Sequence, residues 1–211
     1  MLSVSLLERA LEARDHDRLL RDLADNGLTL PLSLRVSLGQ SETAPLALAL
    51  RRLVELTYSP TDLSRRLVER LLEAQNPDGT FVGSAERDRD PLATAAALAG
   101  LARVAREHPG AVTAELDQAL DRGFAALAEL QDCDGLFSAP ADRSVADRAL
   151  TTAFIVSLLG DAPGFRGAVR LHEICRWFDG HDARLDRHTR QLWDLASLVI
   201  HDIVESAMLA A

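Results

Sequence analysis

One segment of this sequence occurs twice, and the repetition limits the possible folds more than any other feature. Residues 71–81 read Leu-Leu-Glu-Ala-Gln-Asn-Pro-Asp-Gly-Thr-Phe, and residues 127–137 read Leu-Ala-Glu-Leu-Gln-Asp-Cys-Asp-Gly-Leu-Phe. Both copies fit a helix that ends near the glutamine and then turns, since glycine adopts positive φ and aspartate accepts backbone N–H groups in turns. We therefore expect structural roles in the two turns for Gln75, Asp78, Gly79, Phe81, Gln131, Asp134, Gly135 and Phe137.

A segment rich in alanine and threonine follows each copy after a polar loop. These segments are residues 91–98 and 149–156. Weaker copies of the turn, Asp25-Asn26-Gly27-Leu28 and Trp177-Phe178-Asp179-Gly180, precede the segments Thr43–Leu56 and Thr189–Ile203. Recurrence at about 50 residues is typical of stacked repeat units. We therefore expect one domain, residues 1–211, with four consecutive units at about 15–57, 59–107, 112–160 and 164–209.

Apolar residues recur at steps of three and four along most of the chain, for example through residues 63–74. That spacing places them on one face of a helix, and no comparable window alternates with the period of two typical of strands. The pairs Ser59-Pro60 and Asp90-Pro91 each fit an N-cap followed by proline in the first turn. The sequence therefore predicts an all-α fold of four consecutive αα-hairpins, with Leu2–Ala13 as an additional N-terminal helix.

The combination of Gln-x-x-Asp-Gly-x-Phe with a following Thr/Ala-rich helix resembles the repeat of the prenyltransferase and squalene-cyclase superfamily. The resemblance covers residues 63–160 well and the two ends by extension. It implies hairpins stacked into an α/α toroid, and a closed ring of six hairpins needs more chain than this. We therefore expect an incomplete toroid whose inner layer contains the Thr/Ala-rich helices, among them Thr43–Leu56 and Pro91–Val104.

The same resemblance directs attention to acids and metal ligands. Class II terpene cyclases of that superfamily protonate an alkene with Asp-x-Asp-Asp, and Asp88-Arg89-Asp90-Pro91 occupies a similar place here, with proline at the last position. Asp88 and Asp90 are therefore candidate catalytic acids, while Asp90 also fits a plain N-cap. Protein prenyltransferases begin one inner helix with Asp-x-Cys, a zinc-binding pair, and the matching Asp147-Arg148-Ala149 lacks the thiolate.

A local cluster independent of any family contains imidazole, thiol and carboxylate groups. His172 and Cys175 are three residues apart on a predicted helix, and all three side-chain types bind transition metals. The candidate metal ligands are His172, Cys175, Asp179, His181 and His188. The alternative is that Cys175 belongs to the core, Asp179 to a repeat turn and the histidines to the surface.

Composition narrows the classes of partner. Acidic residues outnumber basic ones by 32 to 23, giving a formal net charge of −9, which disfavours a nucleic-acid partner. The longest apolar run, Leu92–Ala102, is too short to span a bilayer. No export signal is visible at the N-terminus and two cysteines are too few for a disulfide framework, so we expect a cytoplasmic protein without a cofactor.

These observations favour a non-catalytic binding module for a protein partner or an apolar small molecule. The alternative is a reduced prenyltransferase- or terpene-cyclase-like enzyme that acts on an isoprenoid. Nine aromatic residues are few for a cavity that stabilises carbocations. The last helix carries apolar residues on more than one face, so we also expect a homodimer with His201–Ala211 in or near the interface.

Overall fold

The computed structural model describes residues 9, 11, 15–83 and 89–209, with side chains described up to residue 200. The regular structure of these residues is helical, apart from one antiparallel bridge between Gln131 and Phe137. The helices are α2 (His16–Asp25), α3 (Leu32–Gly39), α4 (Ala44–Leu56), α5 (Asp62–Glu73), α6 (Pro91–Glu107), α7 (Ala114–Leu130), α8 (Val145–Leu159), α9 (Pro163–Ala168), α10 (Leu171–His181) and α11 (Arg187–Leu209). The predicted all-α class is confirmed. The expected helix Leu2–Ala13 falls mainly outside the described residues.

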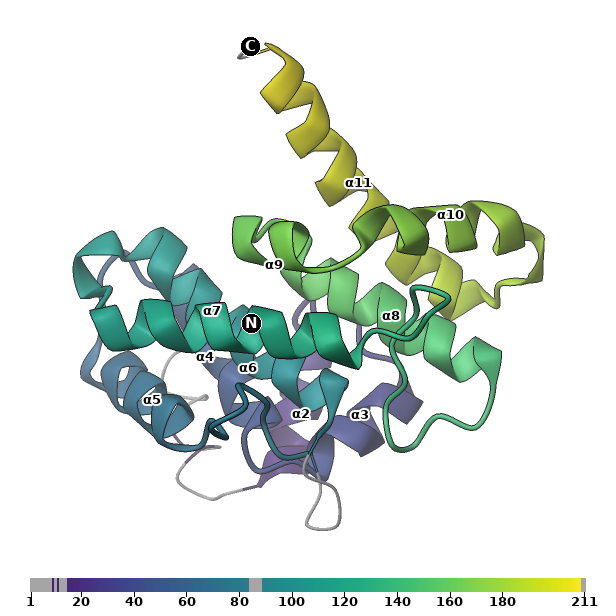
Figure 1. Ribbon diagram of the computed structural model, residues 1–211. Coiled ribbons are helices and arrows are strands. Elements are labelled where there is room, and N and C mark those ends of the chain that lie inside the picture. The colour runs from purple at the N-terminus through teal and green to yellow at the C-terminus, as the bar shows by residue number, and fades with distance from the viewer. Residues whose placement is uncertain (1–8, 10, 12–14, 84–88, 210–211) are drawn as a thin grey trace.

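Helices α4 and α6 lie at the centre of the molecule, whereas the C-terminal part of α11 extends away from it (Figure 1). Helix α4 packs on α6, α6 packs on α8, and α8 packs on α11 (Figure 1). Every residue of α6 from Pro91 to Leu101 is buried, whereas α5 buries only Ser64, Leu67 and Leu71 among its twelve residues. Small side chains allow this crowding, because a methyl group on Gly100 would lie 2.6 Å from the carbonyl oxygen of Ala47.

Side-chain caps determine where α6 and α5 begin. Asp90 caps α6, with its side chain accepting hydrogen bonds from the backbone N–H groups of Leu92 (2.8 Å) and Ala93 (3.4 Å). Helix α5 does not begin at Pro60, as the Ser59-Pro60 pair predicts, but at Asp62. The reason is a reciprocal cap: Thr61 and Ser64 each accept a hydrogen bond from the other's backbone N–H through the side chain.

The fourth predicted turn, Trp177–Gly180, is wrong, because these residues continue helix α10. Aromatic contacts hold the helix there: Trp177 stacks on His181 with ring centroids 4.2 Å apart, and Phe178 stacks on Trp193 at 4.0 Å. Among the glycines of the described residues, Gly27, Gly79 and Gly135 have positive φ, and Gly180 does not. The first unit also differs from a simple hairpin, since α2, α3 and α4 form three helices.

Candidate functional site

The two marker turns have the same backbone geometry. Gly79 and Gly135 each have a φ of +88°. The side-chain amide of Gln75 donates to the carbonyl oxygen of Gly79 at 3.1 Å, and that of Gln131 donates to the carbonyl oxygen of Gly135 at 2.8 Å. Each glutamine therefore closes the loop that its own glycine makes possible.

The aspartates of the motif hold the residue after the glycine. Asp78 accepts a hydrogen bond from the backbone N–H of Thr80, and Asp134 accepts one from that of Leu136, both at 3.1 Å. Hydrogen bonds from Thr80 are the largest reason why the pKa of Asp78 lies below its ordinary value. Both carboxylates therefore act as acceptors inside the turn.

The phenylalanines connect each turn to the next inner helix. The backbone N–H of Phe81 donates to Oγ1 of Thr94 in α6 at 3.0 Å, and that of Phe137 donates to Oγ1 of Thr152 in α8 at 2.9 Å. All four residues are buried. The threonines of the Ala/Thr segments thus satisfy a buried backbone donor in each repeat.

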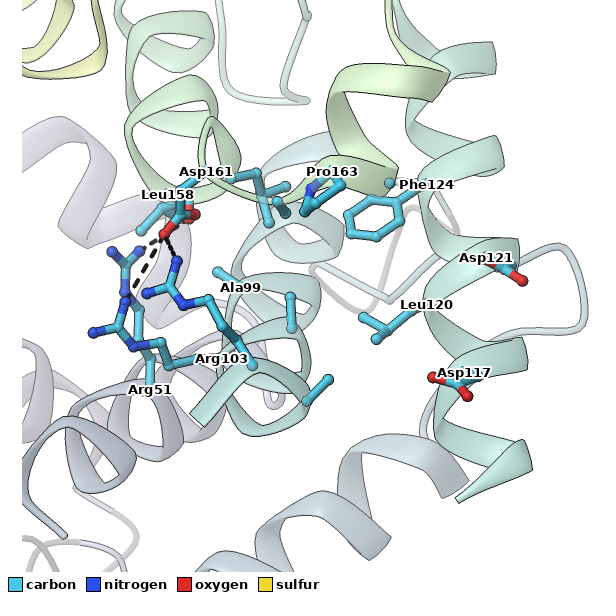
Figure 2. Close-up of a pocket in the computed structure, with 16 residues that line it drawn as sticks. Arg51, Ala99, Arg103, Asp117, Leu120, Asp121, Phe124, Leu158, Asp161 and Pro163 are labelled. Atoms are coloured by element: carbon cyan, nitrogen blue, oxygen red, sulfur yellow. Dashed lines mark hydrogen bonds and ion pairs between the residues drawn. The ribbon is translucent and has the colours of Figure 1, made fainter. Parts of the chain in front are cut away.

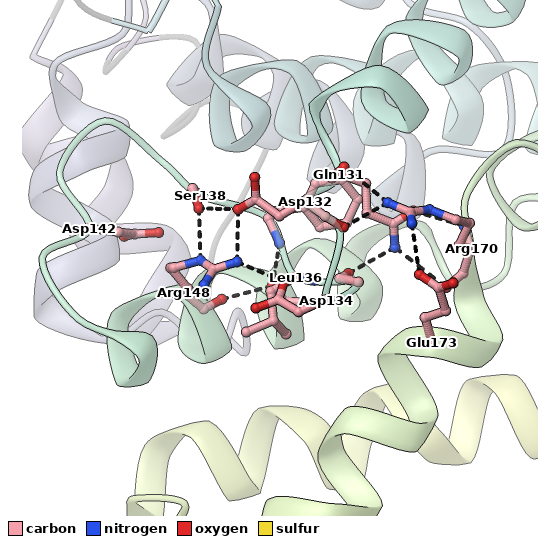
Figure 3. Close-up of polar contacts among 12 residues, drawn as sticks. Gln131, Asp132, Asp134, Leu136, Ser138, Asp142, Arg148, Arg170 and Glu173 are labelled. Atoms are coloured by element: carbon pink, nitrogen blue, oxygen red, sulfur yellow. Dashed lines mark hydrogen bonds and ion pairs between the residues drawn. The ribbon is translucent and has the colours of Figure 1, made fainter.

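An arginine organises the second turn further (Figure 3). Arg148 donates at 2.8 Å to Asp132, to Asp134 and to Ser138. Burial alone would raise the pKa of Asp134, but hydrogen bonds from Arg148 and from the backbone of Leu136 bring it below its ordinary value. Arg148 therefore favours the ionised form of Asp134 and links the turn to α8.

Of the two candidate acids, only Asp90 is among the described residues, and Asp88 lies outside them. Asp90 is 6% exposed, and burial raises its pKa although two backbone N–H groups lower it. Sequence reasoning missed a second such carboxyl, Asp142, whose pKa is raised mainly by burial and also by the charge of Asp90. The cavity beside Asp90 measures only about 20 Å³, which is room for one water molecule.

The five candidate metal ligands do not come together. In the part of the chain that the structure describes, no group of three or more histidine, cysteine or acidic side chains is placed to hold a metal ion. His172 is exposed, while Nδ1 of His181 lies 2.7 Å from the carbonyl oxygen of Trp177. Burial, followed by the charge of Asp179, raises the pKa of the Cys175 thiol. His188 begins helix α11, where its backbone N–H donates to Asp186 at 2.8 Å.

A cleft of about 610 Å³ lies between α6, α7 and the α8–α9 connection, and we call it the α6–α7 cleft (Figure 2). Its walls are apolar: α6 contributes Ala99 and Ala102, and α7 contributes Leu120 and Phe124. One end is closed where the backbone of Gly164 lies against the Phe124 ring, so closely that a methyl group there would be 2.6 Å from the ring. This site combines volume with an apolar lining.

One end of the α6–α7 cleft is charged. Arg51, Arg103 and Asp161 lie on the side of the cleft opposite Asp117 and Asp121 (Figure 2). Arg106 also lines the cleft, beside Asp161. Arg106 hydrogen-bonds Asp161, and although burial opposes the charge of Arg106, this interaction raises its pKa. The sequence gives one indication of this charged end: arginines occur near the C-terminal ends of both Ala-rich helices, α4 and α6.

Comparisons with known proteins leave the family open. No family model matches the chain, and no curated protein matches it. None of the helices in the described part of the chain combines the length and the apolar character needed to cross a bilayer.

Proposed function

We propose that this chain is a non-catalytic α/α-repeat binding module that receives an apolar small molecule in the α6–α7 cleft. The observation that carries the proposal is a cleft of about 610 Å³ whose walls include alanine, leucine and phenylalanine side chains beside a charged end. Pockets of this size and lining are typical of small-molecule sites. Free Cys133 and Cys175 are compatible with the cytoplasm as the place of action.

The proposal includes an incomplete α/α toroid of hairpins as the scaffold. Its support is the succession of contacts α4–α6, α6–α8 and α8–α11 along the centre, with α5 and α7 packed against α6. The matched hydrogen bonds of the two marker turns also support stacked repeats. In such a stack, the C-terminal ends of inner helices and an outer helix can form the walls of one cleft.

A reduced isoprenoid enzyme remains the alternative, and one observation favours it. Asp90 and Asp142 are two carboxyls whose pKa values burial raises, and the charge of Asp90 also raises the pKa of Asp142. A proton donor needs a substrate within reach, however. The cavity beside Asp90 has about 20 Å³, so the binding module has the better support.

A homodimer through His201–Ala211 is part of the same proposal. The side chains of these residues lie outside the described part, but the preceding turns of α11 expose Leu195 (48%) and Leu198 (61%). Exposed leucines on a terminal helix are the kind of surface that a second copy covers. Light scattering that shows a monomer at tens of micromolar would contradict this part.

The cleft is tested with N-phenyl-1-naphthylamine, a neutral apolar fluorescent probe. We expect saturable binding with one probe per chain. Ala102→Trp, which places an indole in the cleft, should weaken binding at least about tenfold, because the volume is filled. Ala125→Trp is the matched control, since Ala125 lies exposed on α7 and outside the cleft lining.

Circular dichroism should first show that both variants are folded, so that a change in probe binding can be assigned to the cleft. Loss of binding in Ala102→Trp alone supports the proposal. Absence of binding to the wild-type chain, or equal binding by wild type and Ala102→Trp, rejects it.

A further inference from the structure

Arg103 is the group in the α6–α7 cleft whose bonding capacity is least used. Its side chain is 23% exposed, and its guanidinium makes ion pairs with Glu107 at 3.5 Å, Asp161 at 3.8 Å and Glu55 at 3.9 Å. None of these is a hydrogen bond, and its buried Nε has no hydrogen-bond partner among the described residues. A guanidinium has five N–H donors, and half-buried donors without acceptors are costly.

The two neighbouring arginines are engaged. Arg51 donates to the backbone carbonyl of Leu158 at 3.2 Å, and Arg106 hydrogen-bonds Asp161. Both line the same end of the cleft as Arg103. Of the three arginines, Arg103 therefore has the most donors to offer, because no hydrogen bond uses its guanidinium among the described residues.

The charges around Arg103 would balance one negative charge on a ligand. A connected network of ion pairs joins four arginines to three carboxylates: Arg51, Arg52, Arg103 and Arg106 with Glu55, Glu107 and Asp161. One positive charge remains uncompensated in that network. Asp117 and Asp121 stand across the cleft, and they repel an anion from the far side (Figure 2).

We propose that the ligand of the α6–α7 cleft is a monoanionic amphiphile, a carboxylate on an apolar tail, with the carboxylate bound by Arg103. This inference rests on the proposed function and names its ligand class. The tail lies between Ala102, Leu120 and Phe124. A planar carboxylate pairs with the guanidinium fork through two parallel hydrogen bonds. A phosphate monoester carries two negative charges. The network that contains the three carboxylates of Glu55, Glu107 and Asp161 offers only one net positive charge to balance them.

The first experiment is displacement of N-phenyl-1-naphthylamine from the wild-type chain by matched pairs of amphiphiles. We expect decanoate to bind about tenfold or more tightly than 1-decanol, because only the acid makes charge-assisted hydrogen bonds. Decanoate should bind more tightly than octanoate by about fourfold for each methylene, since each is buried in the cleft. Dodecylammonium and dodecyl phosphate should both compete less well than dodecanoate.

The second experiment assigns the headgroup contact. Arg103→Gln should remove the preference of the chain for decanoate over 1-decanol, measured as the ratio of the two affinities. Arg52→Gln is the matched control: it removes the same charge from the same Glu55 network, and Arg52 does not line the cleft. The control should retain the preference.

Failure of the inference and failure of the proposed function give different results. If the neutral probe and 1-decanol bind but decanoate has no advantage, the headgroup assignment is overturned and the cleft remains a binding site. Preference for dodecyl phosphate overturns the carboxylate in favour of a phosphate. If Arg103→Gln and Arg52→Gln lose the preference equally, general charge and not Arg103 explains it. If no amphiphile binds, the proposed function fails as well.

Discussion

The turn at residues 75–81 and the turn at residues 131–137 share their internal hydrogen bonds but attach to different partners. Gln75 reaches α7, donating to the carbonyl oxygen of Ala119 at 2.8 Å and accepting from the Arg122 side chain at 2.9 Å. Gln131 reaches the start of α10, where it accepts from the backbone N–H of Arg170 at 2.8 Å. The motif thus specifies the turn and its link to the inner helix, while surrounding residues decide how it meets the next outer helix.

The two inner helices that follow these turns also begin differently. Helix α6 starts at a buried aspartate, Asp90, whose pKa burial raises. Helix α8 starts at Ser144, and Asp147 completes an exposed capping box there; hydrogen bonds from Arg143 and Ser144 lower the pKa of Asp147. The same repeat therefore carries opposite electrostatics at its two copies.

The largest expected effect tests what the two copies share. Gly79→Ala should destabilise the protein by about 3 kcal/mol and Gly135→Ala by about 2 kcal/mol, because alanine resists positive φ and its methyl has no room. Gly79→Ala should cost more because the added methyl would overlap the backbone carbonyl of Arg122. The methyl added at residue 135 would lie 2.9 Å from the Glu173 side chain. Urea denaturation measures both.

Gly27→Ala is the control for that comparison. Gly27 has a φ of +110° with nothing within 4 Å of an added methyl, so only backbone strain of about 1 kcal/mol is expected. Equal losses at all three glycines would show that packing around the marker turns is unimportant.

A smaller effect should distinguish the copies. Arg148→Gln removes contacts to Asp132, Asp134 and Ser138 from a side chain that is 21% exposed, and we expect a loss of about 1–2 kcal/mol. Arg89→Gln removes the matching contact to Asp78 from a side chain that is 53% exposed, with an expected loss below about 0.5 kcal/mol. Thermal and urea unfolding compare the two variants, and an equal loss would contradict the difference drawn between the turns.

The smallest effect is a difference in pH dependence. Because the pKa of Asp90 is raised above 3.8, the stability contributed by its protonated form is present below that pH and is lost as pH rises through the raised pKa. The pKa of Asp147 is lowered, so its contribution is present above 3.8 and is lost as pH falls through the lowered pKa.

The free energy of unfolding, measured between about pH 3 and pH 8, tests these signs. Compared with Asp90→Asn, the wild-type chain should lose stability as pH rises. Compared with Asp147→Asn, it should lose stability as pH falls. Parallel curves for the two comparisons would reject the opposite electrostatics.

Local signals predicted much of the fold. Periodicity and the Asp90-Pro91 pair placed the start of α6 correctly, and the segment Thr43–Leu56 nearly coincides with α4. The start of α8 was less accessible, because the Ser144 capping box precedes the Ala/Thr segment that marked the helix. The short turn-like pattern at Trp177–Gly180 led to a wrong prediction. Aromatic rings from α10 and α11 stack there, and such a tertiary interaction cannot be read from the local sequence.

The site was less predictable than the fold. The α6–α7 cleft brings Arg51, Arg103 and Asp161 together from positions far apart in the chain, and no local spacing indicates that meeting. The proposed metal ligands are close in sequence, yet the described residues hold no group of three such side chains, since His172 is exposed and His181 faces the carbonyl oxygen of Trp177. Asp142 is far from Asp90 in the sequence, and only the fold brings the charge of Asp90 near enough to raise the pKa of Asp142.

The buried first part of α6 anchors the last turns of the helix, which line the cleft. Its residues from Pro91 to Leu101 have no solvent face, and the contact of Gly100 with the backbone of Ala47 leaves α6 no freedom to slide along α4. Packed interiors resist deformation. A change in the width of the cleft therefore requires a shear of α7 or a hinge at the α8–α9 connection, where the backbone of Gly164 lies against Phe124.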